Sequence, residues 1–570
     1  MNFKQYNLWL LIAILYSSIA QTAYAESLLQ QYRMPPLDRV ANTEPAKALL
    51  DDARVLKRAK AVSIAFTAIE DPKAYQNKLR DDIQAGLPSW SEKTPIVEFN
   101  GNKVSEINQL LKKLSGPHRV SLQGQTIMVD EVLSLPSEIL LLGNNATLTA
   151  PTVQSPATVL VAAKSGIIDF TIETTGLGIM VAEAQSVIMR NLRFPNGGRG
   201  IAILNNSRFI EIEQVQINHP QQGGILIQGD VSHVWLHNSE IRNGQRADNG
   251  GAGLLISDAT ANKNIENSTL VGSIAEPLWP IQPAPYALLI ENNIFSGHRT
   301  QGLYIDGGYG LVIQHNQIMH NDKEGMCLDF GAVNNIVMEN VFEGNGYRAR
   351  QTDDELRNDL VLGFGRLADG SAVAKLPAIS LDNAAQNLLL WNIVRDSAGD
   401  GIKIVRTGLR NLIMFNTLMD NNRGTNSRFH FFGVLLGSAG LEAEIDSSNH
   451  PLDFLPPIEN IIAGNMIYGA HWAGILLDQE AAFNDIYDNM IRHYQHLPLE
   501  SASTRFNSIV GNSWQTSCPK EQEISNSMTK SWKEQLVSLL FNWKVWLLML
   551  VIIVGLLLLL LKRRVVLNRS

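Results

Sequence analysis

Apolar and polar positions alternate in short runs along the middle of the chain, where one five-residue pattern recurs. It begins with glycine or alanine, followed by an apolar residue, a variable residue, a second apolar residue and a second variable residue. Its occurrences begin at Gly200, Gly224, Gly253, Gly302, Gly325, Ala378, Gly401, Gly433 and Gly474. Because successive side chains of a strand point to opposite faces, each occurrence predicts a short strand with apolar positions turned inward and variable positions outward.

An asparagine before an apolar residue forms a second repeated column. Its members are Asn293, Asn316, Asn340, Asn392, Asn416, Asn465, Asn489 and Asn512, with spacings of 23, 24, 52, 24, 49, 24 and 23 residues. This period predicts an all-β solenoid, a right-handed parallel β-helix over residues 96–517. The asparagines predict an internal ladder of side-chain amides. Each long spacing is near twice the unit and indicates either an extra coil or an insertion.

The two ends of the chain carry targeting signals. Residues 1–25 read as a secretory signal, with Ala23-Tyr24-Ala25 as its cleavage site. Residues 545–561 are uncharged and predict one transmembrane helix, joined to the β-helix by the connector 518–544. The basic tail 562–570 should stay in the cytoplasm. We therefore predict a single-pass protein of the bacterial inner membrane with most of its chain in the periplasm.

Residues 26–95 differ from the repeat and predict a helical N-terminal region. Ala48–Lys60 and Asp71–Ile83 have helical patterns, and Asp71 followed by Pro72 is typical of a helix start. We expect this region to cap the first coil, or alternatively to be a docking arm for a partner.

The charge and the cysteine content of the chain exclude some classes of function. The 570 residues include 47 Lys and Arg against 55 Asp and Glu, a net charge of −8. Residues 1–25 and residues 545–570 contain cations and no acids. The exported part of the chain therefore has a more negative net charge than the whole chain. No nucleic-acid partner is expected for such a surface. The two cysteines, Cys327 and Cys518, exclude a disulfide framework and a cysteine-based zinc site.

Ionisable residues gather in the outward positions of a few neighbouring strands. Those expected on one face are Tyr304, Asp306, Asp329, Ser380, Asp382 and Lys403. Adjacent coils would place Asp306 and Asp329 about 5 Å apart. Two carboxylates at that distance repel each other, and Lys403, a shared proton or a bound Ca²⁺ must offset the repulsion. Ca²⁺ is the only cofactor that the sequence suggests, and no other metal site is predicted. Each Asp alone suits a turn or a solvated stripe, but three in register favour acid–base chemistry.

The repeat over residues 96–515 resembles the pectin-lyase-like superfamily of β-helix proteins, and Leu135–Leu148 is similar to its early coil. Members include polysaccharide lyases, polygalacturonase-type hydrolases, polyuronate C5-epimerases and phage tailspikes. Tyr304-x-Asp306 with Asp329 one coil later is similar to the Tyr/Asp arrangement of alginate C5-epimerases, although their Asp-Pro-His-Asp motif is absent.

A second resemblance within that superfamily is to the polygalacturonases. Asp329 and Asp382 resemble their carboxylates, and Lys403 resembles their substrate-binding lysine. The Asn-Thr-Asp and Gly-His-Gly motifs of those enzymes are absent. The resemblance therefore implies the fold more strongly than one activity.

Flanking segments supply candidate substrate-binding residues. The insertion 345–375 leaves the coil that carries Asp329 and contains Arg348 and Arg350. Arg299 and His320 stand just before strands of the same coils. All four are predicted to contact substrate from loops beside the aspartates.

Together these features predict a membrane-anchored periplasmic protein that modifies a polysaccharide. The preferred activity is a lyase or C5-epimerase acting on a uronic-acid-containing exopolysaccharide, with an export complex as a partner. Lys403 or Arg350 would neutralise the substrate carboxylate, and an Asp or Tyr304 would move the proton. A glycoside hydrolase with paired Asp residues is one alternative. A non-catalytic glycan-binding or assembly scaffold is the other.

Overall fold

The computed structural model describes residues 69, 71–246, 249–257, 284–346, 376–382, 384–405, 408–422, 431–437, 457–469, 471–478, 481–502 and 507–515. Several predicted features lie outside these residues: the signal 1–25, the helix Ala48–Lys60, Arg348, Arg350 and the span 545–561. Within the described part of the chain, no helix is both long and apolar enough to cross a membrane.

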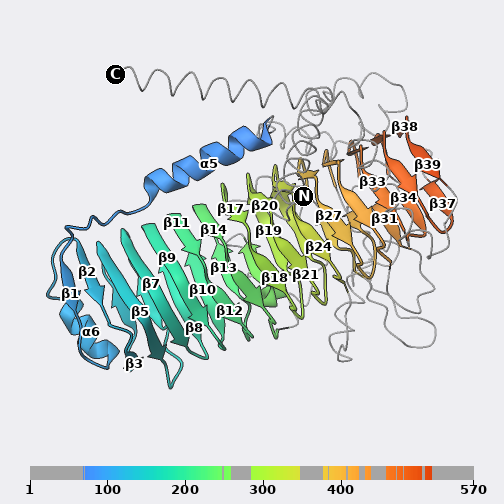
Figure 1. Cartoon of the computed structure of the whole chain (residues 1–570). Helices are drawn as coiled ribbons and strands as arrows, with labels where there is room; N and C mark the ends of the chain where they lie inside the picture. The colour runs from blue at the N-terminus through green and yellow to red at the C-terminus, as the bar shows by residue number, and fades with distance from the viewer. Residues whose placement is uncertain are drawn as a thin grey trace, which may run out of the picture. The chain divides into compact units, whose positions relative to one another are not determined.

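The predicted parallel β-helix is confirmed, and its coils build three strand faces (Figure 1). Face A is a separate 13-stranded sheet in which every neighbouring pair is parallel. Its strands are β4 (Leu133–Leu135), β6 (Val159–Val161), β8 (Leu177–Ala182), β10 (Arg199–Leu204), β13 (Ile225–Gln228), β16 (Leu254–Ser257), β19 (Leu303–Tyr309), β22 (Met326–Val333), β25 (Ile379–Asp382), β28 (Ile402–Val405), β31 (Phe432–Leu436), β34 (Ala473–Leu477) and β37 (Leu497–Ser501).

Faces B and C belong to one larger sheet, because some early strands run through both. Face B contains β1 (Ile96–Glu98), β2 (His118–Ser121), β5 (Ile139–Thr149), β7 (Ser165–Glu173), β9 (Gln185–Phe194), β11 (Arg208–Glu213), β14 (Ser232–His237), β17 (Leu289–Glu291), β20 (Val312–Gln314), β23 (Ile336–Met338), β26 (Leu388–Leu390), β29 (Leu412–Met414), β32 (Ile461–Ala463), β35 (Asp485–Tyr487) and β38 (Ser508–Val510). Face C contains β3 (Thr126–Met128), the ends of β5, β7 and β9, then β12 (Gln216–Asn218), β15 (Glu240–Arg242), β18 (Ile294–Ser296), β21 (Gln317–Met319), β24 (Val341–Glu343), β27 (Ile393–Arg395), β30 (Thr417–Met419), β33 (Met466–Tyr468), β36 (Met490–Arg492) and β39 (Ser513–Gln515).

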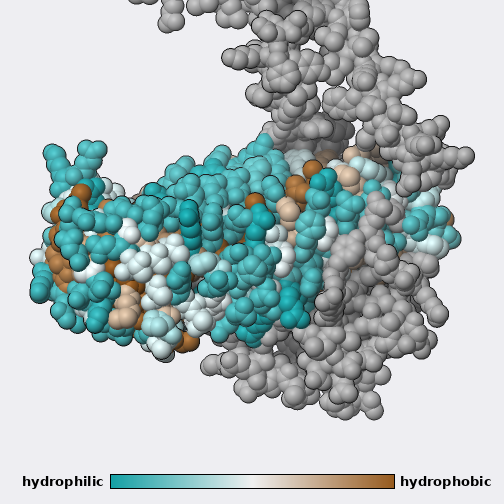
Figure 2. Space-filling view, turned by 60° about the horizontal axis from the view of Figure 1, so that its bottom comes forward, coloured by the Kyte–Doolittle hydropathy of each residue, from teal (hydrophilic) through white to brown (hydrophobic). Residues whose placement is uncertain are grey.

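The core is a continuous column of inward-facing aliphatic and aromatic side chains, stacked coil upon coil. The outer surface seen in Figure 2 is mainly hydrophilic where it is coloured. Exposed apolar side chains occur at the first coils, among them Ile96 and Met128. This inside–outside division follows from the alternation of each short strand.

The predicted asparagine ladder is confirmed, and it resolves both long spacings. Asn340 donates from its Nδ2 to Oδ1 of Asn392 at 3.0 Å, and Asn416 donates to Asn465 in the same way at 3.1 Å. Since these residues are direct neighbours, each long spacing is an insertion within one coil and not an extra coil.

Two further ladders were not predicted. One consists of Asn335, Asn387, Asn411, Asn460, Asn484 and Asn507. The other contains Asn321, Asn345 and Asn421, with His298 and His471 as buried members. Burial lowers the pKa of His298 to about 4, so its ring is neutral and can accept from the backbone N–H of Gly244. His298 is therefore a structural ladder residue.

The predicted helix start is confirmed in α5 (Pro72–Gly86), where Asp71 accepts from the backbone N–H of Ala74 at 2.9 Å. Its location differs from the predicted cap. The helix packs against β11, β14 and β17 on face B (Figure 1), not over the first coil. The helix beside the first coils is instead α6 (Val104–Leu111), whose Val104 and Ile107 join the solenoid core. Leu79 and Ile83 explain the placement, because they pack on apolar side chains that face B turns outward.

Candidate functional site

The predicted row of ionisable residues is in register on face A. Tyr304 pairs with Cys327, Cys327 with Ser380, and Ser380 with Lys403 across β19, β22, β25 and β28. Asp306 pairs with Asp329 on the adjacent strand. Asp382 follows on β25, two positions after Ser380. We call Tyr304, Asp306, Asp329, Asp382 and Lys403 the Asp row.

A hydrogen bond joins two members of the Asp row. The Tyr304 hydroxyl donates to Oδ2 of Asp329 at 3.1 Å, and both side chains are buried. Burial raises the pKa of Tyr304 well above its ordinary value, and the nearby Asp329 and Asp306 charges raise it further. Tyr304 is therefore a protonated donor at neutral pH. In this hydrogen bond Tyr304 is the donor and Asp329 the acceptor.

Asp400 is a buried carboxyl group beside this row. It lies just before β28, and its Oδ1 accepts from the backbone N–H of Phe432 at 2.7 Å. Burial raises its pKa to about 6, against the opposing charge of Lys403 and the Phe432 hydrogen bond. Lys403 is only partly buried. Asp400 thus titrates next to the one cation of the row.

Asp400 should make the stability of the chain depend on pH. Its pKa is about 6 when folded and about 3.8 when unfolded, so the folded state holds the proton longer. Its contribution is greatest below pH 4 and is lost as pH rises through about 6, a change of about 2–3 kcal/mol. Asp400→Asn keeps the acceptor for Phe432 but cannot titrate.

Thermal unfolding of both chains between pH 4 and 7 tests this expectation. The stability of Asp400→Asn relative to the wild-type chain should increase as pH rises through that window. The lowered pKa of His298 makes stability rise with pH, opposite to the effect of Asp400. Both chains contain His298, so its effect cancels from the difference in stability between them. A difference that stays constant over the whole window would show that Asp400 does not titrate as described.

Apolar side chains border the Asp row along face A. On the side of the earlier coils, Leu226, Ala252 and Leu255 pack with Tyr304 and Cys327. On the side of the later coils lie Phe432, Leu435, Trp472, Ala473 and Leu476. The Asp row thus lies between two apolar surfaces of face A.

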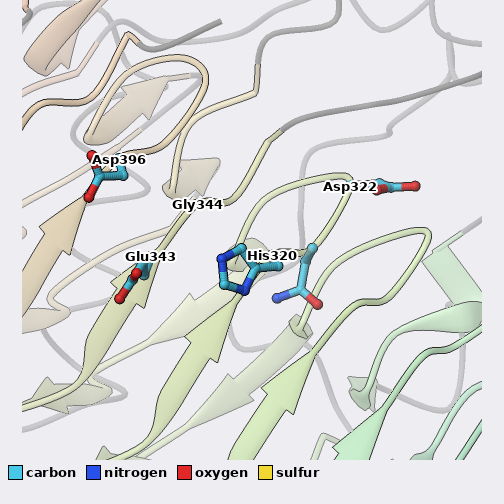
Figure 3. A pocket seen from close by; sticks show the side chains of 6 residues that line it. His320, Asp322, Glu343, Gly344 and Asp396 are labelled. Atoms are coloured by element: carbon cyan, nitrogen blue, oxygen red, sulfur yellow. The ribbon is translucent and has the colours of Figure 1, made fainter.

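His320 lines a hollow of about 380 Å³ on turns that follow strands of face C (Figure 3). Its other lining residues are Asn321, Asp322, Glu343, Gly344 and Asp396. Arg395 pairs with Glu343 at 2.6 Å. None of the lining residues belongs to the Asp row, so the structure does not join His320 to it. Arg299, on a turn of the preceding coil, is exposed and donates to the carbonyl of Gln245 at 3.4 Å.

A possible metal site lies on face B, where the sequence predicted none. Oxygen and nitrogen atoms of Glu211, Glu213 and His237 lie within 4.8 Å of one another. Glu211 and Glu213 are two positions apart on β11, and His237 is in register with Glu213 on β14. The members of this cluster come together through strand alternation and coil stacking, which no local sequence motif reveals.

Arg190 already contacts the carboxylates of this cluster. Its Nε donates to Glu211 at 2.7 Å and lies 3.0 Å from Glu213, while His237 Nε2 faces Glu211 at 3.4 Å. Burial favours a higher pKa for Glu211, but the His237 hydrogen bond and the Arg190 charge outweigh it and hold the pKa low. Imidazole and carboxylate are donors that suit Cu(II). The donor types therefore fit a divalent metal, but the Arg190 guanidinium already pairs with both carboxylates.

These features define a parallel β-helix protein with a row of aspartate, tyrosine and lysine side chains on one face and an ion-pair cluster on another. The chain matches the family model described as periplasmic copper-binding protein (NosD) over residues 144–361 and 288–428, which together cover half of it. The chain belongs to the NosD family. This membership agrees with the predicted periplasmic location, while the membrane anchor stays a prediction.

Solved structures of several activities share the β-helix. The A-module of mannuronan C-5 epimerase AlgE6 from Azotobacter vinelandii is 11% identical, with coverage of 80% of this chain and 99% of that one and a TM-score of 0.37. The GH87 α-1,3-glucanase of Streptomyces thermodiastaticus is 11% identical, with coverage of 76% and 71% and a TM-score of 0.43. The adhesin PfbA of Streptococcus pneumoniae is 12% identical, with coverage of 73% and 93% and a TM-score of 0.37. At these identities the likeness concerns the fold alone. No curated protein sequence matches the chain.

Proposed function

We propose that this protein acts on a uronic-acid-containing polysaccharide in the periplasm, as a lyase or C5-epimerase. The observation that carries the proposal is the Tyr304–Asp329 hydrogen bond within a registered row that also contains Asp306 and Lys403. Both reactions need a base, a proton donor and a cation near one sugar carboxylate. The row offers all three on neighbouring strands.

Each residue has a defined role in the proposed reaction. The Lys403 ammonium neutralises the substrate carboxylate, which makes the adjacent C5–H more acidic. Asp329 takes the C5 proton. In the lyase reaction the C4–O bond breaks and Tyr304 protonates the leaving oxygen. In the epimerase reaction a solvent water protonates C5 from the opposite face, because Tyr304 is hydrogen-bonded to Asp329 and lies on the same side of the ring. After the lyase reaction Asp329 returns its proton to Tyr304 across their hydrogen bond. After the epimerase reaction Asp329 releases its proton to solvent, so each cycle restores both groups.

The reaction class can be read directly by proton NMR. The full chain is incubated with a panel of polyuronates in D₂O. Unsaturated uronate signals identify a lyase, and deuterium at C5 with unchanged chain length identifies an epimerase. New saturated reducing ends would instead support the hydrolase alternative, and glycan binding without turnover would support the scaffold. The predicted span 545–561 and an export complex belong to this proposal as the site of action, next to a polymer that leaves the cell.

Copper binding is the second candidate function, and the cluster of Glu211, Glu213 and His237 favours it together with the family description. His237 would supply an imidazole nitrogen and the glutamates would supply oxygens. The role of Arg190 is decisive here, because its guanidinium must move before a cation can contact both carboxylates.

Arg190→Gln is expected to tighten Cu²⁺ binding at least about tenfold, because it removes the competing charge. Titration of the full chain with Cu²⁺, followed by calorimetry, measures this. His237→Gln in the Arg190→Gln background should abolish the gain. Arg208→Gln removes a neighbouring exposed cation that contacts Gln185 instead, and should change nothing. Equal affinities for all four chains would exclude this cluster as the copper site.

A further inference from the structure

Face B carries an apolar strip on its outer side. In each of β23, β26, β29 and β32 the middle residue joins the solenoid core and the two end residues join a separate apolar cluster. The strip consists of Ile336, Met338, Leu388, Leu390, Leu412, Met414, Ile461 and Ala463. Each of these outward side chains is no more than 6% exposed. An outward apolar surface this well buried must be covered by another part of the molecule.

Among the described residues, α5 is the helix that packs on this side of face B. Its main contacts are with β11, β14 and β17, which precede the strip. Leu79 and Ile83 of α5 belong to the same apolar cluster as the strip. The helix therefore covers one end of a longer apolar surface that continues past it towards the later coils.

The direction of α5 is opposite to the direction in which the coils advance. Its C-terminal Gly86 accepts from Ser186 of β9 at 2.6 Å, Arg80 pairs with Glu291 of β17 at 2.7 Å, and Tyr75 donates to the Gly310 carbonyl before β20 at 2.9 Å. The 15-residue helix is about 22 Å long. The distance from β9 to β20 is about 19 Å, because strands are about 4.8 Å apart. The helix thus lies along the coil axis.

The chain before α5 consequently enters from the side of the strip. Ile69 packs against the same cluster, and the Lys73 charge contributes, after the His315 hydrogen bond, to the lowered pKa of Glu339, just beyond β23. The preceding stretch is rich in apolar residues, including Val62, Ile64 and Phe66. The strip from β23 to β32 is only about 14 Å long, so residues 43–68 have ample length to cover it.

We propose that residues 43–68 of the same chain lie along the strip and hold the start of the exported protein against its later coils. The interface is intramolecular and apolar, and it continues the packing that Leu79 and Ile83 begin. The following experiment can also reveal two other occupants of the strip, a second copy of the chain or the connector 518–544.

Methionine oxidation by hydrogen peroxide, followed by mass spectrometry of the full chain, reports on the cover. Met338 and Met414 lie on the strip and are 2% and 0% exposed, whereas Met466 and Met490 of face C are 39% and 36% exposed. Met326 is a buried core residue and reports on global unfolding. In the intact chain, Met466 and Met490 should oxidise rapidly and the other three slowly.

Deletion of residues 43–68 should raise the oxidation rates of Met338 and Met414 at least about tenfold, towards those of Met466 and Met490, while Met326 stays protected. A synthetic 43–70 peptide should restore protection, and a scrambled peptide should not. If Met326 also becomes reactive, the deletion has unfolded the chain, and two single variants replace it. Met338 and Met414 should then oxidise faster in Phe66→Asp than in Thr67→Asp, because only the former should expose the strip. Continued protection of Met338 and Met414 in the deleted or Phe66→Asp chain would overturn the proposal. Protection that then depends on protein concentration, or on residues 518–544, would assign the other occupants.

Discussion

Asp329→Asn is expected to lower the turnover of the polyuronate substrate by about 10²–10⁴-fold while leaving glycan binding nearly unchanged. The amide keeps the size of the carboxylate and still has an oxygen that can accept from the Tyr304 hydroxyl, so the fold is preserved. It cannot take a proton from C5. The measurement is the rate of C5 exchange or unsaturated-end formation by NMR, together with glycan affinity by calorimetry.

Asp478→Asn is the matched control for that experiment. Asp478 follows β34 in the same outward column as Asp306 and Asp329, but beyond the Asp row. The control should retain full activity. Full activity in Asp329→Asn would remove the proposed base, and an equal loss in both variants would show that the substitutions act through the fold. A loss of binding without a loss of turnover per bound substrate would favour the scaffold alternative.

Lys403 and Tyr304 have different roles from Asp329 in the proposed reaction. If Lys403 neutralises the substrate carboxylate, its replacement acts on binding and on the acidity of C5 together. Tyr304 is protonated because burial and two nearby carboxylates raise its pKa, so it serves as donor and not as base. The sequence alone had left the direction of proton transfer between Asp and Tyr304 open. Burial and the hydrogen bond to Asp329 supply the direction.

The coil architecture and the register of the Asp row could be predicted from the sequence, because both depend on short-range alternation and on a regular period. Asp306 and Asp329 occupy the same place in successive repeats, and the structure pairs them directly. The position of α5 could not be predicted in this way. It depends on which outward strand positions are apolar on face B, and the repeated pattern that was followed describes face A.

The cluster on face B shows a second limit of the sequence. Glu211 and Glu213 are close in sequence, but His237 and Arg190 come from other coils, at neighbouring positions in three stacked strands. Their proximity becomes visible only when all three faces are aligned in register. The ladder of Asn335 and Asn387 was not predicted for the same reason, because its asparagines belong to a different turn of each coil from the predicted column.

Asn416→Ala is expected to reduce the stability of the solenoid by about 3–5 kcal/mol. The Asn416 Oδ1 accepts from both the backbone N–H and the Nδ2 of Asn392 at 2.9 Å. Its Nδ2 donates to the Leu389 carbonyl at 2.9 Å and to Asn465. Alanine removes the side-chain partner of each of these buried groups, and an unpaired buried polar group costs its desolvation free energy.

The loss should spread along the ladder, because each coil is stabilised mainly by its neighbours. Hydrogen exchange should show lost protection in β26, β29 and β32 first, and thermal unfolding should begin at lower temperature. Asn102→Ala is the control: Asn102 is exposed, and its backbone bond to Met128 remains in the variant. That chain should unfold within about 0.5 kcal/mol of the wild type. Equal stability of Asn416→Ala and the control would mean that the ladder contributes little, and that the stacked apolar core alone holds the coils together.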